Sequence, residues 1–486
     1  MRPSSRRALL MLLLAGSGVG CGSRQAAPVT ASSPPAVSTA QDLTNRPGNE
    51  YHVTYKPGTR VISRATLLRS LRSVSTDGSV FVVDPADPDF GAVTPGTVLL
   101  LERVGLRRAR EVRHEQGQLA LLTEAASLTD AIQEGVIKWN IPVRFAPGGP
   151  HLADATADAR ELLARALDTV LAPAQAGGNA ALSGSKNGWK YEVSATPAAG
   201  RLNLAAHVTK SVNGIEATLQ AVGYVPDFNT LAAITIADGT VTQMQLQNEH
   251  LSGEVEMSFS AATTDAPGGF GQKQVRLPTV LKMPFFLGML PVSLEISSAI
   301  TFTPGLGANH QLASARFHLT YTDLKGFDYG GGPAASTNGQ SDGNGEILDT
   351  KGATLAGIGV VAGISMPRLE MKIGTSSIVA ALEKAVPTSL ADALQQTLFG
   401  KLVTQGLADA EESIKTEGAA HVQVVLVGSF LASGPVALIP CQKTTFTFTA
   451  NAGADASVLG TKRGEVAVDL FKKDIVKTNP PNINCG

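Results

Sequence analysis

The sequence predicts a mainly β protein made of antiparallel sheets, sandwich-like or curled, with a few amphipathic helices and an α+β organisation overall. Apolar and polar residues alternate from Arg201 to Thr303, and a strand projects successive side chains to opposite faces of its sheet. Such alternation is typical of antiparallel sheets packed on one face, because the strands of parallel sheets are buried on both faces. Short turn signals separate the runs: Asn213-Gly214, Asp238-Gly239 and Ser252-Gly253.

The alternation gives each predicted strand a dry side and a wet side. Four residues from different runs are expected to turn inward: Leu202, Leu219, Met257 and Ile296. Their immediate neighbours are expected to face water, and in the last run these are Ser293, Glu295 and Ser297. The same pattern returns near the C-terminus at 421–430, 444–449 and 465–470.

Length and composition bound the class of protein. The chain has 486 residues, which is enough for about three domains. Its net charge is −1, so no electrostatic field favours nucleic acid as a partner. A hydrophobic content of 43% permits a sizeable core.

The N-terminus predicts export. Arg2, Arg6 and Arg7 precede a short apolar stretch, as in a signal peptide over residues 1–20. Gly18-Val19-Gly20-Cys21 then resembles a bacterial lipobox, with Gly18 where leucine is usual. The resemblance to bacterial exported lipoproteins implies that the Cys21 thiol is acylated and becomes the new N-terminus. An ordinary signal peptide followed by an unrelated cysteine is the alternative.

The residues after the cysteine indicate where such a protein would lie. Gly22 follows Cys21, and the aspartate typical of inner-membrane retention is missing. The lipobox resemblance therefore implies a lipoprotein of the cell envelope, sorted to the outer membrane of a two-membrane bacterium. Residues 21–48 are rich in Ser, Pro and Ala, which predicts a tether between the lipid and the folded part.

We expect two folded parts after the tether. A small β-rich domain is predicted over 49–146, and a larger antiparallel β domain over 188–486. A helix and joint over 147–187 separate them, with the clearest helical periodicity at Asp154–Leu171. A second helical segment is predicted within the larger domain, at 376–415.

The small domain contains compact apolar runs that predict strands at 79–84, 97–102 and 118–123. Ser127 and Asp130 have the spacing of a capping box and predict a short helix that Gly135 ends. The stretch from Gly96 to Ile132 resembles a β-rich module of bacterial exported surface proteins, to which we attach no activity.

The roles predicted for the three cysteines are consistent with an exported protein. Cys21 is the acylation candidate, which leaves Cys441 and Cys485 as a predicted disulfide, since disulfides persist outside the cytoplasm. Closing this loop of about 45 residues is worth roughly 4 kcal/mol in the chain-entropy model.

Local motifs for chemistry are weak. Asp84, Asp87 and Asp89 suggest a calcium loop, but prolines interrupt it, so a turn is the better interpretation. The eight histidines lie too far apart in sequence for the local zinc spacings.

Two further patterns are better explained without catalysis. Ser183-Gly184-Ser185-Lys186 has a Ser-x-x-Lys spacing but lies in a glycine-rich joint. Glu254 and Glu256 share a strand face, which a solvated sheet explains better than a glycosidase does. The sequence therefore predicts no catalytic residue, no cofactor and no metal site.

The function that the sequence predicts is a non-catalytic binding or structural role for an outer-membrane-anchored lipoprotein. The expected partners are the membrane, through the N-terminal lipid, and an envelope protein or a hydrophobic ligand. One alternative is a carrier of lipid or another hydrophobic ligand, with a curled sheet around a helix. A second is a hydrolase with dispersed site residues.

Overall fold

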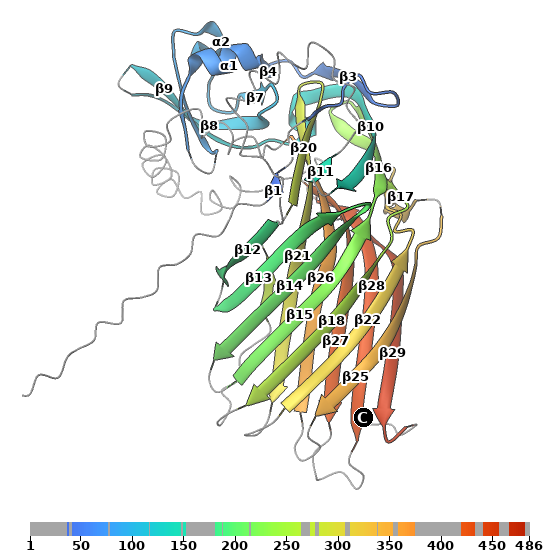
Figure 1. Ribbon diagram of the computed structural model, residues 1–486. Coiled ribbons are helices and arrows are strands. Elements are labelled where there is room, and N and C mark those ends of the chain that lie inside the picture. The colour runs from blue at the N-terminus through green and yellow to red at the C-terminus, as the bar shows by residue number, and fades with distance from the viewer. Residues whose placement is uncertain are drawn as a thin grey trace, which may run out of the picture. The chain divides into compact units, whose positions relative to one another are not determined.

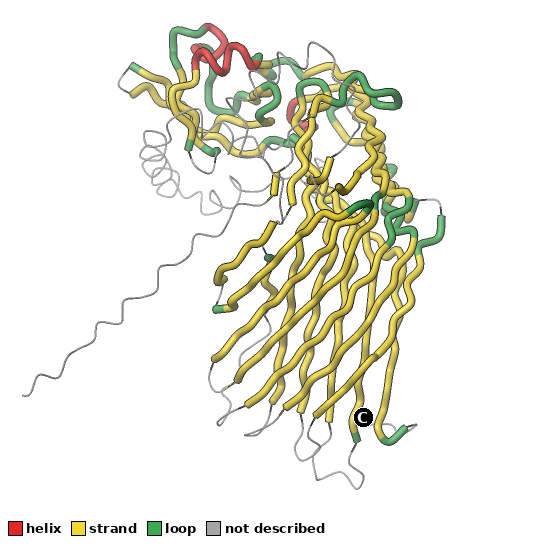
Figure 2. Tube along the Cα trace, viewed as in Figure 1, coloured by secondary structure: helices red, strands yellow, loops and turns green. Residues whose placement is uncertain are grey.

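The computed structural model consists mainly of antiparallel β-sheets, which confirms the predicted fold class (Figure 1). Strands dominate the trace in Figure 2 as well. The structure describes residues 36–37, 41–75, 78–115, 117–146, 149–151, 180–186, 188–212, 215–263, 273–277, 281–306, 312–337, 339–352, 358–374, 419–432, 441–455 and 466–481. The predicted signal peptide, Cys21, the helix at 154–171, the helical segment at 376–415 and Cys485 all lie outside these residues.

The N-terminal sheet has six strands and its own hydrophobic core, which includes Leu67, Phe81, Phe90 and Leu121. In spatial order the strands are β4 (Arg60–Ile62), β7 (Val98–Leu101), β8 (Gly105–Glu115), β9 (Gln118–Ala125), β6 (Val80–Val83) and β5 (Leu71–Val74). The helices of this region are α1 (Arg64–Ser70), α2 (Pro88–Gly91) and α3 (Leu128–Ala131). The three strands predicted here from apolar runs are β6, β7 and β9.

The predicted capping box is present at α3. Ser127 Oγ accepts a hydrogen bond from the Asp130 backbone N–H, and the Asp130 side chain accepts one from the Ser127 backbone N–H. The predicted end at Gly135 is wrong, because the chain enters strand β10 at Ile132. Gly135 instead allows β10 to pack closely against the adjacent strand, because a Cβ at this position would lie 2.8 Å from a Val53 methyl carbon.

A bridging sheet joins the two predicted domains. Its strands are β11 (Gly149–His151), β10 (Ile132–Ala146), β16 (Phe228–Ala237), β17 (Thr240–Glu249), β23 (Phe327–Tyr329) and β24 (Ala335–Ser336), with β3 (Glu50–Tyr55) also paired to β10. Strand β10 pairs along its length with β16, so the sheet continues across the predicted boundary at residue 146. Asp238 and Gly239, a predicted turn, both have positive φ and connect β16 to β17.

The meander sheet contains most of the strands predicted between 201 and 303. Its order is β12 (Ala180–Lys186), β13 (Trp189–Ala198), β14 (Arg201–Val212), β15 (Ile215–Pro226), β18 (Gly253–Thr263), β22 (Leu312–Thr322) and β25 (Asp342–Gly352). Leu202, Leu219 and Met257 are fully buried on one face, as the alternation predicts. The glycine-rich region 326–345 contributes β23, β24 and the start of β25.

The C-terminal sheet has nine strands. Along the main path they are β1 (Ala36–Val37), β20 (Leu281–Leu287), β21 (Leu290–Leu306), β26 (Ile358–Ile373), β27 (Ala419–Ala432), β28 (Gln442–Ala454) and β29 (Val466–Asn479). Off this path, β2 (Gln41–Asp42) pairs with β20 and β19 (Lys273–Arg276) pairs with β21. The apolar stretch 282–292 forms a buried hairpin of β20 and β21.

The dry faces of the meander and C-terminal sheets pack on each other (Figure 1). Phe317 on β22 stacks on Phe446 of β28 at 4.7 Å between ring centroids, and Phe448 continues the aromatic series at 5.2 Å from Phe446. Gly428 on β27 leaves room for the Phe317 ring, because a Cβ at this position would overlap it. Aromatic rings therefore fill this part of the space between the sheets.

One strand departs from simple alternation. Ile296 of β21 is buried as predicted, but Ser293, Glu295 and Ser297, expected to face water, are each only 2% exposed. That expectation is wrong because β21 is an interior strand whose polar face carries paired charges rather than meeting solvent. The polar face of the C-terminal sheet is therefore the unusual surface of this fold.

Candidate functional site: the polar face of the C-terminal sheet

A β-bulge in β26 determines which side chains share this face. The register between β26 and its neighbours shifts between Ser365 and Arg368, so that Ser365 lies across from Val425 and Arg368 from Gln423. Side chains three positions apart on a regular strand point to opposite faces, and the additional residue of a bulge reverses that relation. Ser365 and Arg368 consequently lie on the same face.

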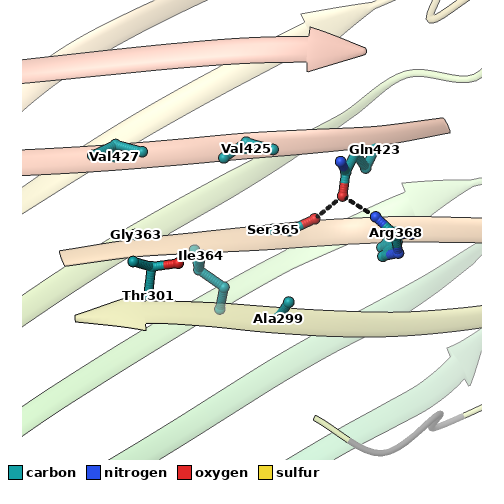
Figure 3. Close-up of a pocket in the computed structure, with 9 residues that line it drawn as sticks. All are labelled: Ala299, Thr301, Gly363, Ile364, Ser365, Arg368, Gln423, Val425 and Val427. Atoms are coloured by element: carbon teal, nitrogen blue, oxygen red, sulfur yellow. Dashed lines mark hydrogen bonds between the residues drawn. The ribbon is translucent and has the colours of Figure 1, made fainter. Parts of the chain in front are cut away.

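Gln423 joins these two residues. Its Oε1 accepts a hydrogen bond from Ser365 Oγ at 2.8 Å and another from Arg368 Nη1 at 2.6 Å (Figure 3). Arg368 Nε donates to Glu370 Oε1 at 2.6 Å. Two of the three guanidinium nitrogens thus hold the group in place, and Arg368 Nη2 remains as a donor that none of the described side chains engages.

A pocket of about 340 Å³ lies along this face. Its polar residues are Ser365, Arg368, Gln423 and Thr301, and the rest of the lining is Ala299, Gly363, Ile364, Val425 and Val427 (Figure 3). The volume is at the lower end of the ~300–1,000 Å³ range of small-molecule sites. The pocket is amphipathic, with Arg368 and Gln423 at one end and Val427, beside Thr301, at the other.

The strand register shows how the pocket runs along the sheet. The row Ser297, Arg368, Gln423 crosses β21, β26 and β27, and the row Thr301, Gly363, Val427 crosses the same strands further along. The two rows are four residues apart on β27, which is about 13 Å at ~3.3 Å per residue. Gly363 lies beside Val427 at the far end of the pocket. Because glycine has no side chain, it leaves this end of the pocket open.

An ion-pair cluster adjoins the polar end. Glu295 Oε1 lies 3.1 Å from Lys282 Nζ, and Glu295 Oε2 lies 3.2 Å from Lys372 Nζ. Burial raises the pKa of Glu295, but the two ammonium groups more than offset this effect, so the net pKa is lowered. Glu295 is therefore a buried carboxylate that its lysine neighbours keep ionised.

Ser365, Arg368 and Glu370 are not among the residues predicted from the sequence, because no strand is predicted over 358–373. A signal was present: Arg368, Glu370 and Lys372 alternate with Leu369, Met371 and Ile373, which is the pattern of a strand with one charged face. Pro367 within this run is also typical of a bulge.

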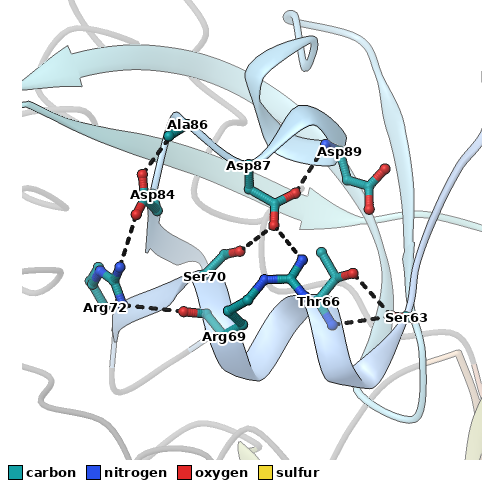
Figure 4. A network of polar contacts seen from close by, with 9 residues as sticks. All are labelled: Ser63, Thr66, Arg69, Ser70, Arg72, Asp84, Ala86, Asp87 and Asp89. Atoms are coloured by element: carbon teal, nitrogen blue, oxygen red, sulfur yellow. Dashed lines mark hydrogen bonds and ion pairs between the residues drawn. The ribbon is translucent and has the colours of Figure 1, made fainter.

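Of the three aspartates that suggest a calcium loop, Asp84 and Asp87 use their carboxylates within the protein, and Asp89 donates its backbone N–H to Asp87 (Figure 4). Asp87 is the N-cap of α2, accepts a hydrogen bond from Ser70 Oγ at 2.7 Å and pairs with Arg69 at 2.8 Å. Its hydrogen bond from Arg69 is the largest of the effects that lower the pKa of Asp87. Asp84 pairs with Arg72. This arrangement supports the interpretation as a structural turn.

The other sequence candidates do not converge. Ser183 to Lys186 lies on strand β12 rather than at a helix start. Glu254 contacts His318 Nε2 at 2.9 Å and Glu256 lies 3.6 Å from Arg316 Nε, each from β18 to β22, on a partly exposed face. These are cross-strand pairs of opposite charge, which is the usual composition of a solvated sheet surface.

The cysteine predictions remain predictions. Cys441 is buried immediately before β28, and Cys485 lies outside the described residues. Gln442 pairs with Asn479, so β29 returns the chain to the neighbourhood of Cys441 six residues before Cys485. This register is compatible with the predicted disulfide.

Among the residues that the structure describes, three or more His, Cys, Asp or Glu side chains nowhere gather as a metal site would require. Among the described helices, none has the length and apolar character needed to cross a membrane.

Comparison with known proteins identifies one region. Residues 41–134 match a family described as "Domain of unknown function (DUF8403)", which covers the N-terminal sheet and its helices. Comparisons with curated proteins and with solved structures each find no match. The N-terminal region is thus similar to a family without an assigned activity.

Proposed function

We propose that this protein is a non-catalytic binding protein of the cell envelope, anchored to the outer membrane through a lipid on Cys21. The anchor rests on the lipobox resemblance and on the Ser/Pro/Ala-rich segment that follows it. The binding role rests on a single observation, the 340 Å³ pocket on the polar face of the C-terminal sheet.

The chemistry of the pocket favours binding over catalysis. Its polar groups are a guanidinium, an amide and hydroxyls, and the guanidinium is hydrogen-bonded to Glu370 and Gln423. Such groups orient a ligand, whereas a hydrolase requires an activated nucleophile or a general base within reach of the substrate. The carboxylates near this face are paired with lysine or arginine.

The alternative carrier function receives support only in a modified form. The aromatic series from Phe317 to Phe448 occupies the space between the dry faces, so a ligand enclosed there is not favoured. The aliphatic end of the polar-face pocket offers a site for an alkyl group instead.

The anchor can be tested by fractionation. In a two-membrane bacterium the wild-type protein should sediment with the membranes, and Cys21→Ala should leave it in the soluble envelope fraction. Cys441→Ala is the matched control, since it alters a cysteine without altering the lipobox. Identical membrane partitioning of the wild type and Cys21→Ala would contradict the proposed anchor.

The binding role can be tested on protein purified from the envelope. Native mass spectrometry should find the full chain carrying a bound small molecule, and the pocket-filling variant Val427→Trp should lose that mass. Retention of the same mass by the variant would show that the ligand lies elsewhere, and an unliganded wild-type chain would contradict the binding role.

A further inference from the structure

We infer that the pocket binds an amphiphile with a single anionic head group, a carboxylate or a phosphate, whose head contacts Arg368 and whose alkyl chain lies along Val425 and Val427. This inference rests on the proposed binding function and specifies its ligand class.

The polar end of the pocket presents donors. Gln423 Oε1 accepts two hydrogen bonds, from Ser365 and Arg368, and this fixes the amide so that its Nε2 is the group left to donate. Arg368 Nη2 is the second donor left over. A guanidinium and an amide N–H₂ side by side match the oxygens of a carboxylate or phosphate.

A buried hydroxyl lies next to this end. Ser297 is 2% exposed, its Oγ has no hydrogen-bond partner, and it lies directly across from Arg368 in the β21–β26 register. Leaving a buried polar atom unpaired is unfavourable, so such an atom in a native structure calls for an explanation. Ser297 is not part of the pocket lining but adjoins it at Arg368, on the side from which a ligand oxygen would be held.

The groups around this end are charged and largely buried. Lys282, Lys372 and Arg368 are cationic, and they pair with Glu295 and Glu370. Because charge interactions strengthen away from bulk water, a guanidinium that presents Nη2 here favours an anion over a neutral head group.

The rest of the pocket fits an alkyl chain. Ala299, Val425 and Val427 contribute aliphatic side chains over the ~13 Å between the row of Gln423 and the row of Val427. Burial of an alkyl chain contributes about 0.8 kcal/mol for each methylene removed from water. A medium-length chain would supply most of the affinity, and the anionic head would fix its direction.

Isothermal titration of the full chain with decanoate and with decyl phosphate tests this inference. The protein should carry Cys21→Ser, which removes the acylation site and the need for a detergent that would compete for the pocket. At least one of the two anions should bind with one-to-one stoichiometry. The stronger binder distinguishes a carboxylate from a phosphate head group.

An uncharged probe and a probe without an alkyl chain test the two ends of the pocket separately. Decanol and acetate should each bind on the order of tenfold to a hundredfold more weakly than the better anion, since one lacks the charge and the other the chain. Equal binding of decanol would overturn the anionic head group, and equal binding of acetate would overturn the alkyl site.

Two variants locate the site without disturbing the ion pairs. Val427→Trp should abolish binding because it fills the apolar end and leaves Arg368 and Glu370 in place. Val361→Trp, an exposed position two residues beyond Gly363 on the same face, is the matched control and should bind as the wild type does. Unchanged binding by Val427→Trp, or no binding of either anion by the wild type, would overturn the inference. Because membrane anchoring through Cys21 is measured separately, it could survive such a result.

Discussion

Arg368 Nη1 and Gln423 Oε1 lie 2.6 Å apart across the β26–β27 ladder, and this contact depends on the bulge that turns Arg368 to the face of Ser365. The same guanidinium contacts Glu370 from its own strand at 2.6 Å. Glu370 and Gln423 therefore hold the Arg368 guanidinium from two directions. Its Nη2 is directed at neither of these two residues. The orientation of Arg368 in the pocket therefore depends on its ion pair with Glu370.

Removing Arg368 should destabilise the protein through the carboxylate that it leaves behind. Arg368→Gln removes one cation from the 3%-exposed Glu370, and breaking a buried pair on one side costs about 3–5 kcal/mol. The double variant Arg368→Gln, Glu370→Gln should cost much less than the sum of the two single variants. Denaturant unfolding of all four proteins measures this, and strictly additive effects would contradict a coupled pair.

Glu295 should make stability depend on pH. Because its lysine neighbours lower its pKa in the folded protein, the ionised group stabilises the fold above the unfolded-state pKa of about 4.3, and that stabilisation is lost as pH falls through the lower folded-state pKa. Glu295→Gln should therefore be clearly less stable than the wild type at pH 7.

The difference between these two proteins should shrink as the solution is acidified below the ordinary glutamate pKa. Unfolding midpoints in urea at a series of pH values measure it. A constant difference across the acid range would show that Glu295 does not contribute through its charge. Glu256→Gln, at an exposed cross-strand pair, serves as the matched control and should show little change.

The packing of the two sheets should be sensitive to one methyl group. Gly428→Ala places a Cβ into the ring of Phe317, and overpacking of this kind costs typically about 1–3 kcal/mol. Gly332→Ala, where nothing lies within 4 Å of the added atom, is the control and should be nearly neutral. Thermal unfolding compares them, and equal stability of the two variants would argue against close contact between the sheets.

Asp87 should stabilise the N-terminal region through its three contacts. Asp87→Ala removes the N-cap of α2 and leaves the buried Ser70 hydroxyl without its acceptor, for which we expect a loss of about 1–3 kcal/mol. Added calcium should not restore stability to the variant or raise that of the wild type. A calcium-dependent increase in the melting temperature of the wild type would contradict the structural interpretation of this loop.

Much of the fold was predictable because strand burial has a two-residue period. Leu202, Leu219, Met257 and Ile296 were expected inside on that ground, and all four are buried. Asp238-Gly239 identified a hairpin because both residues can adopt positive φ. The capping box at Ser127 was visible because its two hydrogen bonds require particular residues three positions apart.

What could not be predicted depends on contacts between distant segments. Nothing in the local sequence indicates that β10 pairs with β16, and this pairing carries the sheet across the expected domain boundary. Glu295 was expected to face water because charge usually indicates exposure, but Lys282 and Lys372 from two neighbouring strands make its burial tolerable. The pocket was missed because it requires the bulge before Arg368 and the register that sets Gln423 opposite it.

The measurement that tests the account most directly is ligand protection of a cysteine in the pocket. In a chain carrying Cys21→Ser, Val427→Cys should react with a small thiol reagent, and saturating decanoate or decyl phosphate should slow that reaction at least tenfold, whereas Val361→Cys should react at the same rate with and without ligand. If the rate at Val427→Cys is the same in the presence and absence of both anions, the polar face of the C-terminal sheet is not the ligand site.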